Sequence, residues 1–266
     1  MPLALEKFVH LLYNSKYAAA CYLCGWRRKE GFMNNIEFFE KFLKYFSRAL
    51  MILLVMPVIN SARGLAAKSQ GDDTAEQEGR ITLNPFMHLD PIGSLAILLC
   101  GFGWSKPMPF NVNRMKDRRR GIVILSATGP ITHFVFAILC NLIMNIMLCS
   151  ESIRSKLTLS DITPVFCFFF ILSIISSINV CLGVINLLPL PGMDGFNILY
   201  QYAPPKFLNW YHGNYVRINQ MSTIILLALF FMPVITGGYF DPLGWLINIV
   251  GSGLSLLTSW IPSKFG

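Results

Sequence analysis

Asp194 is the residue of this sequence whose type and position most clearly suggest chemistry. It lies in Leu188-Pro-Leu-Pro-Gly-Met-Asp194-Gly195, directly after a long apolar run. The prolines prevent a helix from continuing, and an irregular backbone is tolerated at membrane depth only beside protein or a wet cavity. We therefore expect Asp194 to face such an interior, because a carboxylate exposed to lipid is costly. An ordinary aspartate in an interfacial loop is the alternative.

Other polar side chains lie within the apolar runs. Asn179 and Asn186 are seven residues apart and share one helix face, with three serines nearby (Ser173, Ser176 and Ser177). Such a stripe serves either hydrogen bonding between helices or the lining of a substrate cavity. His133, in Gly129-Pro130-Ile-Thr-His133, is a further candidate. We favour a hydrogen-bonded membrane histidine, because a metal site would need partners from other elements.

Cys21-Tyr-Leu-Cys24 is a single CxxC motif without a second pair. A zinc or redox site is conceivable there, but unpaired thiols near the membrane are the simpler interpretation. The other cysteines are scattered, and four of them lie in apolar runs (Cys100, Cys140, Cys167 and Cys181). This distribution does not indicate a disulfide framework.

The composition identifies the elements that must position these residues. Of the 266 residues, 54% are hydrophobic and 14% are charged, whereas soluble domains carry about 25% charge. Long apolar runs without strand-like alternation predict an all-α fold, a bundle of several membrane-spanning helices. The net charge of +8 comes from basic clusters that flank these runs. They indicate cytoplasmic anchors of membrane helices and not a nucleic-acid surface.

The predicted organisation is an N-terminal cytoplasmic or interfacial arm, residues 1–40, and a membrane domain, residues 41–266. The first span is expected near 42–59, with a bend at Pro57. Residues 91–104 are apolar but too short to cross upright, so they predict a re-entrant or tilted segment. In total, four firm spans and one or two partial ones are expected. Beyond the first span, the apolar regions are 121–149, 162–188, 222–235 and 243–260. Residues 201–219 predict an interfacial segment.

Three segments resemble the compact bacterial branch of the site-2 protease (M50-type) family of intramembrane zinc metallopeptidases. Gly79-Arg-Ile-Thr-Leu-Asn-Pro-Phe-Met-His-Leu-Asp-Pro-Ile-Gly93, followed by Gly103-Trp-Ser-Lys-Pro107, is similar to a long stretch of that branch. Gly129-Pro130 resembles its GPxxN signature, and Asn186-Leu-Leu-Pro-Leu-Pro-Gly-Met-Asp194-Gly195 resembles its LDG motif. Several long motifs in one order are more specific than one short motif. The resemblance implies a site-2-protease-like core over about residues 42–250.

The resemblance also implies a mechanism. Two histidines of an HExxH helix and the LDG aspartate, here Asp194, should hold a zinc ion, and the glutamate of that helix should act as general base. The cleft for a membrane-spanning substrate is expected at these residues: Gly129, Pro130, His133, Asn186, Pro189, Pro191 and Asp194. His133 stands where the family usually has the asparagine of GPxxN.

The sequence departs from the family at the HExxH positions, which fall on Ile59-Asn60-Ser61-Ala62-Arg63. Neither isoleucine nor a guanidinium group can bind zinc, and an amide is not a general base. The four histidines offer no other register, because no two of them are four residues apart (His10, His88, His133 and His212). Asp194 is then a vestigial third ligand. We expect Arg63 to pair with it, as a cation in place of zinc.

These departures predict a non-catalytic member of the family, without zinc, and the branch that the sequence resembles implies a bacterial cytoplasmic membrane. It would bind or regulate a membrane-spanning segment of a partner protein, or an active protease. The alternative is an active intramembrane zinc metalloprotease with unusual ligands or with ligands from a partner chain. A small transporter was also considered, but no inverted repeat or pair of broken helices supports it.

Overall fold

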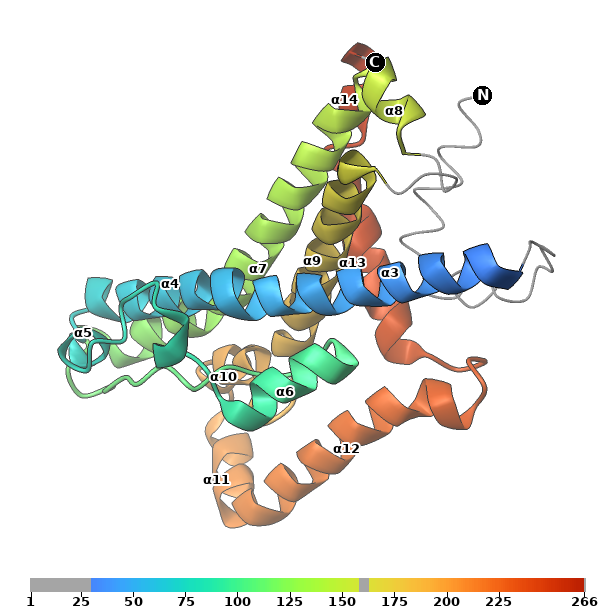
Figure 1. Cartoon of the computed structure of the whole chain (residues 1–266). Coiled ribbons are helices and arrows are strands. Elements are labelled where there is room, and N and C mark those ends of the chain that lie inside the picture. Colours follow the sequence, from blue (N-terminus) through green and yellow to red (C-terminus); the bar gives the residue numbers. More distant parts are fainter. Residues whose placement is uncertain (1–29, 158–162, 266) are drawn as a thin grey trace. The chain divides into compact units, whose positions relative to one another are not determined.

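The computed structural model describes residues 30–157 and 163–265, and all of its regular elements there are helices (Figure 1). Cys21, Cys24, His10 and most of the predicted arm lie outside the described residues. The elements are α3 (Glu30–Leu50), the π-helix η1 (Met51–Val55), α4 (Met56–Ser69), α5 (Thr74–Gln77), the 3₁₀ helix η2 (Pro85–Met87), α6 (Pro91–Cys100), α7 (Arg118–Leu148), α8 (Glu151–Ser155), α9 (Pro164–Asn186), α10 (Asp194–Tyr200), α11 (Pro205–Gly213), α12 (Tyr215–Ile235), α13 (Pro242–Leu256) and α14 (Trp260–Phe265).

Five helical stretches of the described chain are long and apolar enough to cross a membrane. They are Phe38–Ser69, Arg118–Leu148, Pro164–Asn186, Tyr215–Pro233 and Pro242–Pro262. The all-α, multi-span fold class is therefore confirmed. The boundary predicted at residue 40 falls inside α3, and the division into an arm and a membrane domain stays a prediction.

The first helix differs from the prediction, which ended it near Ile59. The helix continues through α4 to Ser69, because the polar residues after Ile59 are buried rather than solvated. Asn60 and Ser61 are only 4% and 8% exposed, and Gly64 packs closely on Ile81. The bend expected at Pro57 stays a prediction, and a π-helix, Met51–Val55, ends two residues before this proline. A π-turn accommodates the missing backbone donor of a proline.

The chain forms two compact units. Unit 1 contains the described residues up to Ala49 together with Phe136–Val180 and Gly244–Gly266, and unit 2 contains Leu50–Val135 and Cys181–Leu243. In unit 1, Ser176 of α9 donates a hydrogen bond to Asn141 of α7 at 3.0 Å. Asn179 is fully buried and donates to the carbonyl of Ile175 on its own helix. This part of the polar stripe therefore forms hydrogen bonds between two helices, at Ser176, and within one helix, at Asn179.

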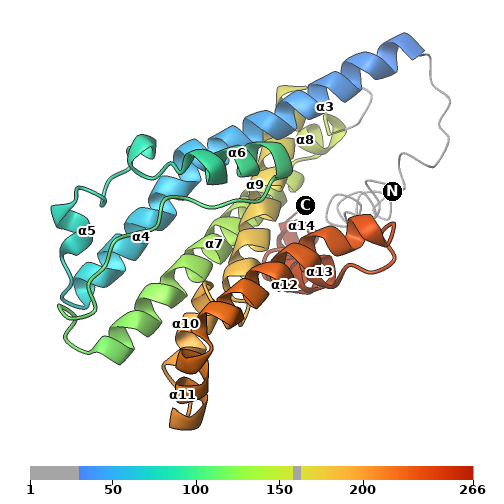
Figure 2. The same cartoon turned by 90° about the horizontal axis from the view of Figure 1, so that it is seen from below.

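The short apolar segment lies in unit 2 and returns beside its own entry, as a re-entrant segment would; its position in a membrane stays a prediction. Asp90 caps α6 by accepting a hydrogen bond from the Gly93 amide at 2.7 Å, and Gly101 ends the helix at φ 80°. A Cβ on Gly93 would lie 2.1 Å from the Trp104 carbonyl oxygen, so only glycine permits this close approach. The connection to α7 then runs back along α4 (Figure 2).

Asp72 fixes the turn after α4 to this connection. It is fully buried, and its carboxylate accepts hydrogen bonds from the Thr74 amide and hydroxyl and, at 2.6 Å, from the Asn111 amide. Burial opposes ionisation, but these hydrogen bonds outweigh it and hold the pKa of Asp72 below its ordinary value of 3.8. The turn is therefore tied to the α6–α7 connection by an ionised group.

We expect Asp72→Asn to lower the free energy of unfolding by about 1.5 kcal/mol at pH 7, because an amide cannot accept all three bonds. The contribution of a carboxylate with a lowered pKa is present above its unfolded pKa and is lost as pH falls through the folded pKa. The gap between wild type and variant should therefore close in acid. Unfolding in detergent micelles at pH 7 and pH 3 measures this, and an equal gap at both values would contradict the assigned role.

Candidate functional site

An ion pair joins α4 to α10 at two positions where the resemblance places metal ligands. Nη2 of Arg63 lies 2.5 Å from Oδ2 of Asp194, and the two side chains are 24% and 13% exposed. The pair predicted from the sequence is therefore confirmed. Both residues belong to unit 2. A charge-assisted hydrogen bond of this kind is stronger than a neutral one, and it pairs two opposite charges that are both partly buried.

Gly129 of α7 makes room for this pair. A Cβ on Gly129 would lie 2.0 Å from Nη2, 2.4 Å from Nε and 2.5 Å from Cζ of Arg63. The guanidinium group therefore rests directly on the backbone of α7, where any larger residue would displace it. Nε of Arg63 is buried without a hydrogen-bond partner. The Gly-Pro signature, placed by resemblance in the cleft, here accommodates the arginine.

The backbone around Asp194 is held by two further contacts. A Cβ on Gly195 would lie 2.1 Å from the carbonyl oxygen of Leu187, so glycine lets α10 start directly against the end of α9. Ser222 of α12 donates a hydrogen bond to the Pro191 carbonyl at 2.9 Å. The proline-rich segment is thus anchored on both sides, and it presents Asp194 at the first position of α10.

Burial raises the pKa of Asp194, and the Arg63 guanidinium opposes this rise both by its charge and by its hydrogen bond. Arg63 therefore offsets part of the cost of ionising this buried carboxyl group. In a metal site the same compensation would come from the cation itself. Here the compensating charge is covalently part of the chain.

The other two degenerate positions are buried beside this pair on α4. Ile59 is 2% exposed and packs as a core residue. Asn60 accepts a hydrogen bond from Ser105 Oγ at 3.2 Å, while its Nδ2 has no partner. Ser61 donates to the Thr82 carbonyl oxygen, which His88 Nε2 also contacts at 2.8 Å. Asn60 and Ser61 thus tie α4 to the segments around α6.

These residues do not fit zinc. Of the three expected ligand positions, one holds the apolar side chain of Ile59 and one holds the guanidinium group of Arg63. The third is Asp194, whose Oδ2 already accepts a hydrogen bond from Arg63. Within residues 30–157 and 163–265, no three side chains of His, Cys, Asp or Glu come together as a metal site would require. The donor set around Asp194 is therefore that of a salt bridge.

The predicted cleft residues lie in unit 2 on α7 and around the end of α9. Pro130 and His133 are buried within α7, with His133 only 3% exposed. Asn186 is the last residue of α9, Pro189 is exposed, and Pro191 lines a pocket with Trp210 and Ser222. Arg63 brings Gly129 and Asp194 together. A cleft formed by the whole set stays a prediction.

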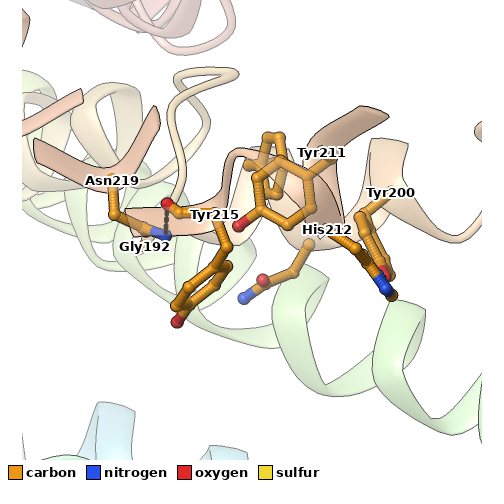
Figure 3. A pocket seen from close by; sticks show the side chains of 8 residues that line it. Gly192, Tyr200, Tyr211, His212, Tyr215 and Asn219 are labelled. Atoms are coloured by element: carbon orange, nitrogen blue, oxygen red, sulfur yellow. Dashed lines mark hydrogen bonds between the residues drawn. The ribbon is translucent and has the colours of Figure 1, made fainter. Parts of the chain in front are cut away.

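A pocket that the sequence did not indicate lies where α10, α11 and α12 meet (Figure 3). Its volume is about 630 Å³, and its lining is mostly aromatic and amide side chains. The residues labelled there are Gly192, Tyr200, Tyr211, His212, Tyr215 and Asn219. The sequence signal is a run of aromatic residues near 201–219, which by itself predicts only an interfacial segment.

Relatives of known name support the resemblance. The chain is 33% identical over 201 residues to "Putative zinc metalloprotease YwhC" of Bacillus subtilis, an alignment that covers 73% of this chain and 87% of that protein. It is 25% identical over 196 residues to "Putative zinc metalloprotease Rip2" of Mycolicibacterium smegmatis, covering 71% of this chain and 68% of the relative. The protein of that name from Mycobacterium tuberculosis H37Rv is 26% identical over 187 residues, covering 68% and 65%.

No protein-family model and no solved structure matches the chain. The identity to YwhC nevertheless extends over most of both proteins, and the three motif segments occur in the family's order. With the all-α membrane fold, this leads to one conclusion: the chain belongs to the site-2 protease family.

Proposed function

We propose that this protein is a non-catalytic member of the site-2 protease family. The observation that supports it is the Arg63–Asp194 ion pair, which takes up the carboxylate that a zinc ion would need. Hydrolysis in this family depends on a metal-bound water and a general base. Ile59, Asn60 and Arg63 provide neither the ligands nor the base.

We further propose that the protein binds or regulates a membrane-spanning segment of a partner in a bacterial cytoplasmic membrane. The support is the retention of the motif residues around the former metal position, such as Gly129 and Asn186, in a fold whose helices span a membrane. A scaffold that recognises a helix needs these packing surfaces but not the metal. An active protease of the same family is a second kind of partner for such a scaffold.

One observation favours a different function, an active zinc metalloprotease whose missing ligands come from a partner chain. The relatives are named as zinc metalloproteases, and Asp194 is retained. This alternative requires the guanidinium of Arg63 to leave Asp194 before a metal could bind.

A cleavage assay with single-span reporter substrates in nanodiscs separates the two functions. We expect no cleavage by the wild type in zinc-containing buffer, alone or with a family protease carrying an inactivated HExxH glutamate. A triple variant, I59H N60E R63H, restores the missing residue types and controls for substrate quality when it is active. Cleavage by the wild-type chain that is abolished by Asp194→Ala would overturn the proposal.

A further inference from the structure

The pocket at α10, α11 and α12 is built from aromatic rings that point in different directions. The rings of Tyr200 and His212 are nearly parallel, with 10° between their planes, and Tyr200 Oη lies 2.5 Å from His212 Nε2. Tyr211 is inclined by 66° to Tyr200, and Tyr215 by 86° to Tyr211. The tyrosine rings contact one another edge to face, and together they line one side of the pocket (Figure 3).

The rings are held in place independently of any ligand. Tyr211 is 7% exposed and forms the hub, with ring centroids of Phe196 and Tyr215 at 5.2 Å and 5.7 Å. The Tyr200–His212 contact fixes α10 to α11. An open, largely aromatic hollow with a few polar groups is a candidate site for a small ligand.

The lining carries no formal charge when His212 is neutral, since its described members are glycine, phenylalanine, tyrosines, asparagines and this histidine. An anion would find no basic partner among them. A cation, however, is attracted by the negative faces of several aromatic rings. Arg217, close to Tyr215 in sequence, lines the neighbouring pocket with Trp210 instead. The charge distribution therefore favours an organic cation.

The position of the pocket points to the membrane interface. Tyr215 and Asn219 are in the first turns of the candidate span Tyr215–Pro233, whereas the α10 and α11 residues precede that span. Trp210 and Tyr202 are exposed nearby at 57% and 62%, as expected for aromatic side chains at headgroup level. A lipid headgroup can therefore reach the pocket as readily as a dissolved molecule.

We propose that this aromatic pocket binds an organic ammonium group, supplied by an ethanolamine lipid headgroup or by a free quaternary ammonium compound. This site is separate from the Arg63–Asp194 pair, and the inference holds whether or not the protein is a protease. The ring faces recognise the positive charge, while Asn197 offers an amide group to the polar remainder of the ligand; the amide of Asn219 instead donates to the Tyr215 carbonyl at 2.8 Å.

Choline and its uncharged isostere 3,3-dimethyl-1-butanol provide the direct test, because the two have similar shape but only choline is charged. We expect choline to raise the melting temperature of the full-length protein in detergent in a saturable way. The isostere and sodium chloride at equal ionic strength should not. Equal stabilisation by the isostere, or no effect of choline, would overturn the proposal.

Tyr215 is the ring to substitute, because it is 56% exposed and its loss should leave the fold intact. We expect Tyr215→Leu to weaken the apparent choline affinity about five- to tenfold, the effect of losing one ring face. Tyr215→Phe keeps the ring and should stay within about twofold of wild type. Unchanged affinity in the leucine variant, with an unchanged melting temperature without ligand, would contradict the assigned role of the ring.

Nanodiscs distinguish the two sources of the ammonium group. The protein is reconstituted in phosphatidylglycerol alone and in phosphatidylglycerol with phosphatidylethanolamine. If the headgroup occupies the pocket, it competes with choline, so the choline-induced shift in melting temperature should be smaller in the discs that contain phosphatidylethanolamine. Sodium chloride should not restore the shift. An equal shift in both discs assigns the site to a free cation, and no shift in either disc would refute an ammonium site.

Discussion

Arg63→Ala should lower the free energy of unfolding by about 3 kcal/mol, since removing one partner of a buried pair leaves the other charge uncompensated. Asp194 is 13% exposed and would keep its carboxylate in the interior without the guanidinium. The sign of the pH dependence follows from burial, which raises the folded pKa of Asp194. A carboxylate with a raised pKa destabilises the fold above that pKa, so the deficit of the variant should shrink as pH falls.

A double-mutant cycle isolates the pair. Asp194→Ala removes the orphaned charge, so the double variant R63A D194A should be more stable than R63A alone. Unfolding of all four proteins in detergent micelles at pH 7 gives the coupling. Arg63→Lys serves as the charge-retaining control, and we expect an intermediate loss because lysine lacks the planar fork. Additive single effects, or a silent R63A, would show that the pair does not stabilise the fold.

Gly129→Ala should cost about 2 kcal/mol, because a methyl group in a filled space displaces its neighbour. The displaced group is the guanidinium, whose nearest nitrogen would lie 2.0 Å from the new Cβ. The side chain of Arg63 is long enough to move away, so the cost is mainly the distorted hydrogen bond to Asp194 and not a backbone clash.

The same substitution should change sign in the Arg63→Ala background. With the guanidinium absent, alanine in a helix interior is favoured over glycine by up to about 1 kcal/mol. Comparing G129A in the two backgrounds therefore tests whether the arginine is what Gly129 accommodates. A loss of equal size in both would show that the methyl group clashes with something other than Arg63.

The long-range contact in the site could be predicted from the sequence because two motifs fixed its register. Matching the segments around Gly64 and Asp72 to the family placed Arg63 at a ligand position, and the LDG motif placed Asp194 at another. Simple charge complementarity then predicted the pair that the structure contains. The re-entrant segment was likewise predictable from its length, since about 14 apolar residues cannot cross a bilayer upright.

The remainder depended on tertiary context. Polar residues such as Asn60 and Ser61 suggested the end of a helix, but their bonds to Ser105 and Thr82 hold these two side chains in the interior, and the helix continues to Ser69. The aromatic pocket was missed because its rings come from three helices, and no single helix carries a periodic pattern that reveals it. Local sequence rules describe one element at a time, whereas these sites form between elements.

The central claim is that Arg63 takes the place of the metal. The most direct measurement is the zinc content of the purified full-length protein by elemental analysis, for the wild type and for Asp194→Ala, after exposure to excess zinc and dialysis. Our account predicts no stoichiometric zinc in either protein, because a catalytic zinc site normally uses three protein ligands. One zinc ion per wild-type chain, lost in Asp194→Ala, would contradict it.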